Sequence, residues 1–221
     1  MPPEFSWRRR RLSENGRPAQ ERECPDLSGR VVAHLCIDMQ KMFGEETDWR
    51  TPWMDRVLPV VEEIARRHAA ETVFTRFIPP SSPEEAEGSW RAYFERWRDF
   101  TLDRIDPELL KLLDPLARLT PPATVLDKPG YSPFHGTSLD EQLRERGVDT
   151  LVITGAETDM CVAAAVLSAV ERGYFVVLVK DALCSSSDDT HDALIKLYAQ
   201  RFGQQIFLTT AEPLLAAWPE R

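Results

Sequence analysis

The chain has 221 residues, of which 43% are apolar and 29% are charged, and its formal net charge is -9. This composition is ordinary for a globular protein, and the length suits one large domain or two small ones. The negative charge argues against nucleic acid or an anionic membrane as a partner, because both attract a basic surface. The sequence also contains no apolar stretch of transmembrane length.

The first 29 residues are polar and rich in arginine and proline. We expect 1–29 to form an N-terminal arm, either flexible or wrapped on a neighbouring subunit, ahead of a single domain over 30–221. No apolar segment follows the arginine run, so no secretory signal is predicted. The spacing of the four cysteines fits neither a metal pair nor a disulfide framework, so we expect a cytoplasmic protein with free thiols.

Apolar runs and helical spacings alternate along the rest of the chain. In chain order we predict a strand at 31–38, a helix at 53–70, a strand at 72–77, helices at 84–100 and 106–119, a strand at 123–128, a helix at 137–146, a strand at 150–154, a helix at 159–172, a strand at 174–179, a helix at 187–202, a strand at 205–208 and a helix at 211–218. Strands separated by helices indicate an α/β domain with a parallel sheet and helices on both faces.

Three side chains with useful chemistry stand at or just after predicted strand ends. Asp38 ends the first strand, Lys128 ends the third, and Cys161 follows the fourth across a short turn. Ligands of parallel sheets bind at the carboxyl ends of the strands. An acid, an amine and a thiol at this edge can form a nucleophilic site.

Cys161 is the candidate nucleophile. Gly155 permits a sharp turn out of the strand, and Thr158 is a candidate N-cap that would place Cys161 in the first helical turn. There the helix dipole favours a thiolate, and unpaired N–H groups can hold an oxyanion. The alternative is a small buried apolar residue, which is our interpretation of Cys36 and Cys184.

The chain resembles the isochorismatase-like cysteine hydrolases. The segments that carry the resemblance are Leu35-Cys36-Ile37-Asp38-Met39-Gln40, Lys128-Pro129-Gly130-Tyr131-Ser132-Pro133-Phe134, Val152-Ile153-Thr154-Gly155 through Cys161-Val162, Gly173-Tyr174 and Val179-Lys180-Asp181-Ala182. They occur in the family's order from about Val31 to the C-terminus.

The resemblance implies a three-layer α/β/α domain with a six-stranded, mostly parallel, Rossmann-like sheet, in a homo-oligomer such as a dimer or tetramer. It implies a catalytic triad of Asp38, Lys128 and Cys161 and a cis peptide bond between Ala156 and Glu157. It also implies that the backbone N–H groups of Glu157 and Cys161 bind the oxyanion.

The presence of Cys161 favours the branch of the family that cleaves amide, carbamoyl or ureido C–N bonds of small molecules through a thioester. None of the four histidines pair at metal-ligand spacing, so we expect no metal and no cofactor. Two alternatives stay open: an isochorismatase-type hydrolase of a non-amide substrate, in which Cys161 is incidental, and a non-catalytic member of the fold.

Aromatic residues near the predicted strand ends are candidates for the substrate pocket. We single out Phe43, Trp90, Trp97, Tyr131 and His135, although a place in the core or an interface is the alternative for the tryptophans. The acidic residue at position 157 would favour a cationic or hydrogen-bond-donating substrate.

Overall fold

A six-stranded parallel sheet forms the centre of the computed structural model, which describes residues 24–220. The strand order is β3-β2-β1-β4-β5-β6, and every pairing is parallel. The strands are β1 (Val32–Ile37), β2 (Thr72–Phe77), β3 (Thr124–Lys128), β4 (Thr150–Ala156), β5 (Phe175–Cys184) and β6 (Ile206–Thr209). The predicted parallel α/β fold is confirmed.

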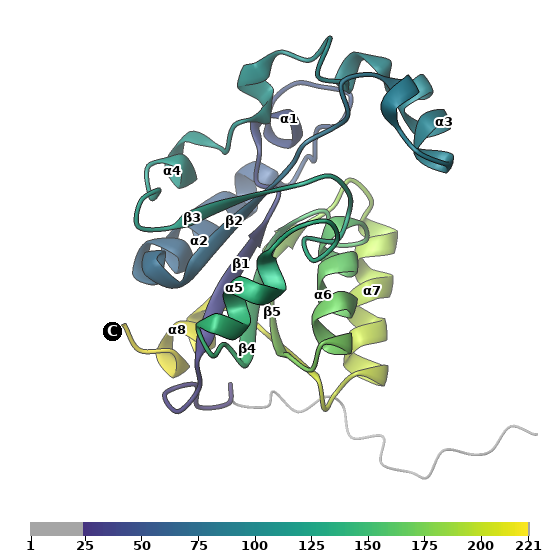
Figure 1. Cartoon of the computed structure of the whole chain (residues 1–221). Coiled ribbons are helices and arrows are strands. Elements are labelled where there is room, and N and C mark those ends of the chain that lie inside the picture. The colour runs from purple at the N-terminus through teal and green to yellow at the C-terminus, as the bar shows by residue number, and fades with distance from the viewer. Residues whose placement is uncertain (1–23, 221) are drawn as a thin grey trace, which may run out of the picture.

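Helices connect the strands and cover both faces of the sheet (Figure 1). The α-helices are α1 (Lys41–Gly44), α2 (Met54–Arg67), α3 (Ser89–Arg96), α4 (Asp114–Ala117), α5 (Leu139–Glu145), α6 (Cys161–Glu171), α7 (Asp188–Arg201) and α8 (Ala211–Ala217). The short 3-10 helices are η1 (Ala69–Glu71), η2 (Pro83–Glu85), η3 (Arg98–Phe100) and η4 (Pro107–Leu110).

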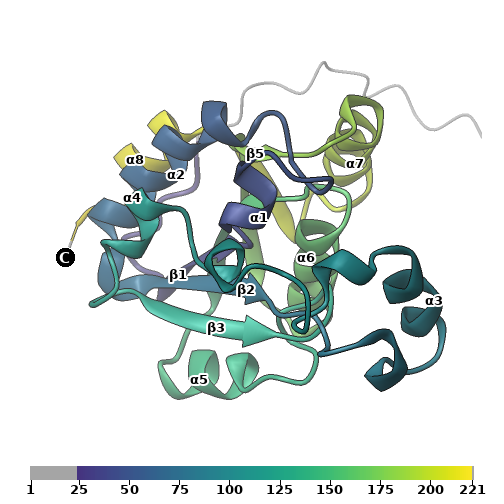
Figure 2. The ribbon, with the colours of Figure 1, turned by 90° about the horizontal axis from the view of Figure 1, so that it is seen from above.

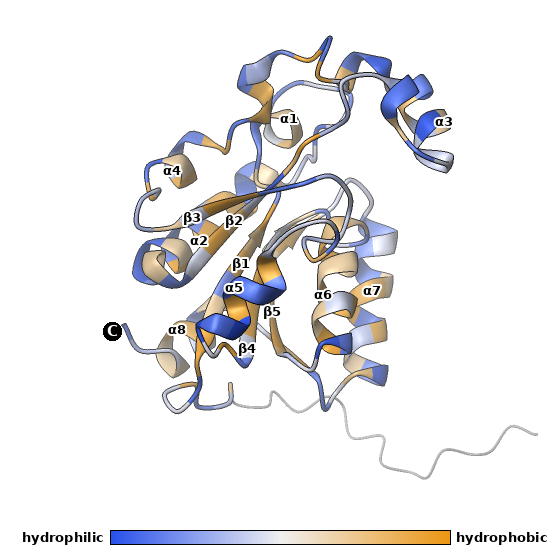
Figure 3. Cartoon of the chain, in the orientation of Figure 1, coloured by the Kyte–Doolittle hydropathy of each residue, from blue (hydrophilic) through white to orange (hydrophobic). Residues whose placement is uncertain are grey.

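Side chains of the central strand β1 alternate between two apolar layers. Val32 and Cys36 pack with α2 and α8 on one face, whereas Leu35 and Ile37 pack with α5, α6 and α7 on the other. All six residues of β1 are buried, as a strand covered on both faces requires. Figure 3 shows the strands coloured predominantly as hydrophobic, while α5 carries hydrophilic residues on one side. These layers place the carboxyl ends of the strands at one edge.

Two long predicted helices are each interrupted in the structure. The prediction for 84–100 is wrong as one helix: η2, α3 and η3 replace it, and Gly88 adopts a φ of 57°, outside the helical region. The prediction for 106–119 is also wrong as one helix, because Leu112 leaves the helical path to bridge Gln40 between η4 and α4. The views agree that α3 lies at the periphery, away from the sheet (Figures 1 and 2).

The predicted N-terminal arm is described only in part, because 1–23 lie outside the described residues. From Cys24 onward the chain packs on the domain. Leu27 is 1% exposed, belongs to the α2–α8 layer and donates a backbone hydrogen bond to the carbonyl of Ala217 at 3.1 Å. No helix between residues 24 and 220 is long and apolar enough to cross a bilayer.

A buried histidine links three strands in the core. His34 Nδ1 lies 3.1 Å from Thr72 Oγ1 and His34 Nε2 lies 2.8 Å from Thr154 Oγ1. Burial, with a smaller contribution from His68, lowers the pKa of His34 to about 3. The folded protein therefore holds this ring neutral at pH values where the unfolded chain protonates it.

We expect His34 to make the folded state less stable in acid. Below its ordinary pKa of 6.5, the unfolded state binds a proton that the folded state excludes. The free energy of unfolding should therefore fall by about 1.4 kcal/mol per pH unit down to about pH 3. Denaturant titrations across this range should show a shallower slope for His34→Gln than for the parent. Equal slopes for His34→Gln and the parent would contradict the assignment.

Candidate active site

Asp38, Lys128 and Cys161 meet at the carboxyl edge of the sheet. Asp38 follows β1, Lys128 ends β3, and Cys161 is the first residue of α6. Lys128 Nζ lies 2.7 Å from Asp38 Oδ2 and 3.4 Å from Cys161 Sγ. The ammonium group therefore touches both the carboxylate and the thiol.

The backbone and a neighbouring hydroxyl fix the carboxylate of Asp38. Its φ of 47° lies in the left-handed region, which is uncommon outside glycine. Thr75 Oγ1 donates a hydrogen bond to Asp38 Oδ1 at 2.6 Å and accepts one from Asp38 N at 3.1 Å. Among residues 24–220, Oδ2 accepts no hydrogen bond beyond its ion contact with Lys128. One carboxylate oxygen is thus held by Thr75, and the other faces the Lys128 ammonium.

Lys128 is held as a cation inside the protein. It is 1% exposed, and it donates a hydrogen bond to the carbonyl oxygen of Gly130 at 2.8 Å. Burial by itself would lower the pKa of Lys128, but the neighbouring Asp38 and Cys161 outweigh it and raise the pKa above the ordinary value. Lys128 therefore keeps its positive charge although it is buried.

The thiol of Cys161 is less acidic than the sequence suggests. Burial, followed by the charge of Asp38, raises its pKa, and the opposing effect of Lys128 is smaller. The prediction that the helix start lowers this pKa is therefore wrong for the free protein. Thr158 is also not the N-cap: α6 begins after Met160, and Thr158 Oγ1 instead donates to the carbonyl of Cys184 at 3.1 Å.

Two backbone N–H groups lie in the turn between β4 and α6. The Ala156–Glu157 peptide bond is cis. The carbonyl of Glu157 accepts hydrogen bonds from the N–H groups of Met160 and Val162, both at 3.1 Å. Within residues 24–220, neither the N–H group of Glu157 nor that of Cys161 donates a hydrogen bond to a backbone carbonyl. Both residues also line the pocket beside the thiol.

A small pocket opens beside Cys161. Its volume is about 50 Å³, far below the size of drug-binding pockets, so it suits a molecule of few atoms. The residues that line it are Phe43, Trp49, Phe77, Tyr93, Tyr131, Ala156, Glu157, Met160 and Cys161.

Some of the pocket candidates from the sequence lie elsewhere. Trp90, Trp97 and His135 are not part of this lining. Trp90 lies behind it, with its ring 4.8 Å from that of Tyr131, and Trp97 packs edge-on against Trp49 at 5.9 Å. His135 is exposed. Their roles in substrate contact remain predictions.

Two residues of the site, Tyr93 and Thr75, escaped the sequence reasoning. Tyr93 comes from α3, so no strand-end rule points to it. Thr75 has a local signal, since it is a hydroxyl residue in an otherwise apolar part of a buried strand.

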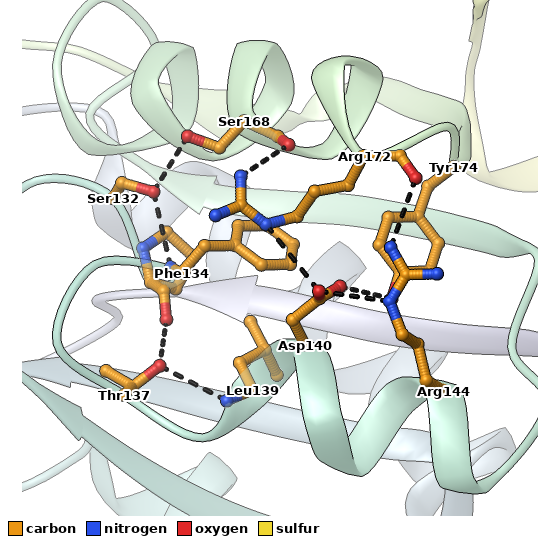
Figure 4. A network of polar contacts seen from close by, with 10 residues as sticks. Ser132, Phe134, Thr137, Leu139, Asp140, Arg144, Ser168, Arg172 and Tyr174 are labelled. Carbon is orange, nitrogen blue, oxygen red and sulfur yellow. Dashed lines mark hydrogen bonds and ion pairs between the residues drawn. The ribbon is translucent and has the colours of Figure 1, made fainter.

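A polar network anchors the loop between Lys128 and α5 (Figure 4). Ser132 Oγ donates to Ser168 Oγ on α6 at 2.9 Å. Asp140, at the start of α5, accepts from the hydroxyl of Tyr174 at 2.7 Å and from Arg144 Nε at 3.0 Å. This loop carries the carbonyl of Gly130 and the ring of Tyr131, so the network positions one wall of the pocket.

The described residues offer no clear metal site. Between residues 24 and 220, no three His, Cys, Asp or Glu side chains gather as metal ligands. His34 lies in the core of the sheet, and His68 stacks on Trp218 at 3.6 Å. His191 Nδ1 lies 2.8 Å from Thr158 Oγ1.

The fold and this site together indicate the class of the protein. It is a hydrolase with a cysteine in a buried acid–lysine–thiol cluster, at the carboxyl edge of a parallel sheet. The isochorismatase domain family matches residues 32–211. The chain therefore belongs to the isochorismatase family and is an isochorismatase-family hydrolase.

Several named proteins are similar to this chain in sequence. Nicotinamidase 3 of Arabidopsis thaliana is 27% identical over 172 residues, which cover 77% of this chain and 81% of that protein. Enterobactin synthase component B of Escherichia coli is 31% identical over 84% of this chain and 63% of its own length. The ureidoacrylate amidohydrolase RutB of Methylorubrum extorquens is 45% identical over 52% of this chain and 40% of its own length. The matches thus span less than two thirds of the last two proteins.

Solved structures share the fold. An isochorismatase family protein from Desulfovibrio vulgaris superposes with a TM-score of 0.71 at 27% identity, over 84% of this chain and 96% of that one. A cysteine hydrolase from Pseudomonas syringae has a TM-score of 0.73 at 22% identity, over 85% and 93% of the two chains.

Proposed function

We propose that the protein is a metal-independent cysteine amidohydrolase that cleaves a C–N bond of a small amide, carbamoyl or ureido compound through a thioester. The observation that carries this proposal is the contact of the buried Lys128 ammonium with both Asp38 and Cys161. The names of two relatives, a nicotinamidase and a ureidoacrylate amidohydrolase, support amide-type chemistry.

In the proposed reaction Asp38 Oδ2 accepts the proton of the Cys161 thiol as substrate enters. The thiolate attacks the amide carbonyl carbon, and the N–H groups of Glu157 and Cys161 bind the oxygen that becomes negative. The tetrahedral intermediate collapses when Asp38 returns its proton to the leaving nitrogen, which departs as the amine or ammonia. Water, deprotonated by Asp38, then hydrolyses the thioester and releases the acid.

Lys128 has an electrostatic role in this scheme. While the thiol is protonated, its charge pairs with Asp38; once the proton has moved, the same charge pairs with the thiolate. Lys128 need not move, because its ammonium already lies 2.7 Å from the carboxylate and 3.4 Å from the sulfur. The raised pKa of Lys128 supports this role, since the ammonium keeps its proton throughout.

An amide panel with a trapped intermediate tests the proposal. We expect the protein to release ammonia or an amine from at least one small amide or ureido compound, at a rate that chelators leave unchanged. Acid quenching during turnover should trap the acyl group on Cys161. The peptide that contains this residue should then gain the mass of one acyl group. Turnover with no acyl adduct, or turnover of non-amide substrates alone, would contradict the thioester and favour an isochorismatase-type reaction.

We also propose that the enzyme is a cytoplasmic homo-oligomer. Cys24, Cys36, Cys161 and Cys184 are all free thiols, as a reducing compartment favours. Leu167 on α6 and Leu197 on α7 are 41% and 42% exposed, so apolar side chains are open to a second subunit. A monomeric mass in light scattering at working concentration would rule out the oligomer.

A further inference from the structure

Glu157 gives the pocket a negative charge that no residue of the site neutralises. Its side chain lines the pocket beside Cys161. Its Oε1 accepts a hydrogen bond from the backbone N–H of Ser186 at 2.9 Å and lies 3.5 Å from Thr51 Oγ1. Both contacts are to neutral groups, and no ion pair joins Glu157 to a Lys, Arg or His between residues 24 and 220.

The other charges of the site cancel one another. Asp38 and Lys128 form a buried pair, and the raised pKa keeps the Cys161 thiol neutral in the free protein. The pocket and triad together therefore carry one carboxylate in excess of their cations. A substrate with its own positive charge would remove this imbalance, whereas an anionic substrate would add to it.

The remaining walls of the pocket suit a cation. Aromatic side chains line it together with Glu157, and there are five of them: Phe43, Trp49, Phe77, Tyr93 and Tyr131. Phe43 stacks on Trp49 at 6.1 Å, and Tyr93 lies 6.1 Å from the same indole. Aromatic faces attract ammonium and amidinium groups, and they do so most strongly where water is excluded.

We infer that this pocket selects small amides that carry a cationic group, and that the Glu157 carboxylate together with the aromatic walls makes the selection. The inference rests on the proposed amidohydrolase function for its reaction, but the charge preference of the pocket can be measured without turnover.

Charged thiol reagents measure that preference at Cys161 itself. The protein is treated separately with a methanethiosulfonate that bears a trimethylammonium group and with one that bears a sulfonate, and labelling of the Cys161 peptide is followed by mass spectrometry. Each rate is divided by that of the same reagent with 2-mercaptoethanol. We expect the normalised rate of the cationic reagent to exceed that of the anionic reagent by about tenfold or more, since a unit charge nearby produces at least this difference.

Glu157→Gln is the diagnostic variant, because its side-chain carbonyl can still accept from the N–H of Ser186. We expect it to lower the ratio about tenfold. Glu171→Gln, the same change at the exposed far end of α6, should leave the ratio unchanged. A parent ratio near or below one, or equal ratios in the parent and Glu157→Gln, overturns the inference. Should that variant fail to fold, the parent ratio must still decline as salt is added, and a ratio insensitive to salt overturns the inference.

Three amides of similar length connect the charge preference to turnover. They are β-alaninamide, which carries an ammonium group, the neutral butyramide and the anionic succinamate. We expect kcat/KM to rank in that order, and Glu157→Gln to reduce the advantage of the cationic over the neutral amide. Preference for succinamate would defeat this inference and leave the amidohydrolase intact. Turnover of no amide would defeat the proposed function, while the reagent ratio still decides the charge preference.

Discussion

Cys161→Ala should abolish amide hydrolysis while the protein stays folded. The thiol is the atom that would form the thioester, and neither Asp38 nor Lys128 can replace it as a nucleophile because they are paired with each other at 2.7 Å. We expect kcat to fall by at least about 10³-fold, as for nucleophiles in other covalent hydrolases. Steady-state ammonia release on the best amide of the panel is the measurement, and circular dichroism reports the fold.

The matched control is Cys36→Ala, which removes a fully buried thiol from strand β1. It should reduce stability moderately and leave kcat within a few-fold of the parent, because Cys36 faces the α2–α8 layer and lies outside the pocket lining. Retention of full turnover by Cys161→Ala would remove the thioester mechanism and leave the alternative in which this cysteine is incidental.

Gly155→Ala should be among the most destabilising single substitutions in the domain. Gly155 pairs with Ile37 across β1 and β4, with a φ of 105° that side-chain-bearing residues rarely adopt. A Cβ here would lie 2.1 Å from the carbonyl oxygen of Ile37 and 2.7 Å from its nitrogen. Both are backbone atoms of a buried strand, so the two strands must separate. We expect a loss of about 3–5 kcal/mol in the free energy of unfolding.

Gly147→Ala separates the two causes of that loss, which are the backbone strain of a positive φ and the steric clash with Ile37. Gly147 also has a positive φ, of 67°, but an added Cβ would meet nothing within 4 Å. Its cost should therefore be the backbone strain alone, about 1–2 kcal/mol. Denaturant unfolding of both variants gives the comparison, and equal losses would show that the close approach of Gly155 to Ile37 contributes nothing. Any folded Gly155→Ala should also lose turnover, because Asp38 follows Ile37 directly.

Much of the fold follows from local sequence patterns. The six strands lie within a few residues of their predicted positions, since apolar runs of this kind are stable only when both faces are covered. The positions of the strand ends also predicted that Asp38, Lys128 and Cys161 lie at one edge of the sheet. In the structure Lys128 contacts both of the other two side chains. Strand β5 was predicted too short, because its later half includes the charged residues Lys180 and Asp181.

Helical spacing by itself was a poorer guide in the aromatic region. Residues 84–100 have the periodicity of one amphipathic helix, but the chain breaks into η2, α3 and η3 around two small aromatic clusters. There Trp49 packs on Phe100 with ring centres 3.9 Å apart, a contact between segments far apart in sequence. Packing of this kind is worth more than the local helical preference that it interrupts.

The sequence by itself determined the parallel α/β fold, the strand ends and the identity of the acid, the amine and the thiol, because these depend on the order and spacing of neighbouring residues. Only the tertiary structure decided the direction in which the pKa of Cys161 shifts and which residues form the walls of its pocket. A helix start favours a thiolate, but burial and the charge of Asp38 raise the pKa of the Cys161 thiol. Desolvation depends on every segment packed around an atom, including Trp49 and Tyr93, and no local pattern contains that information.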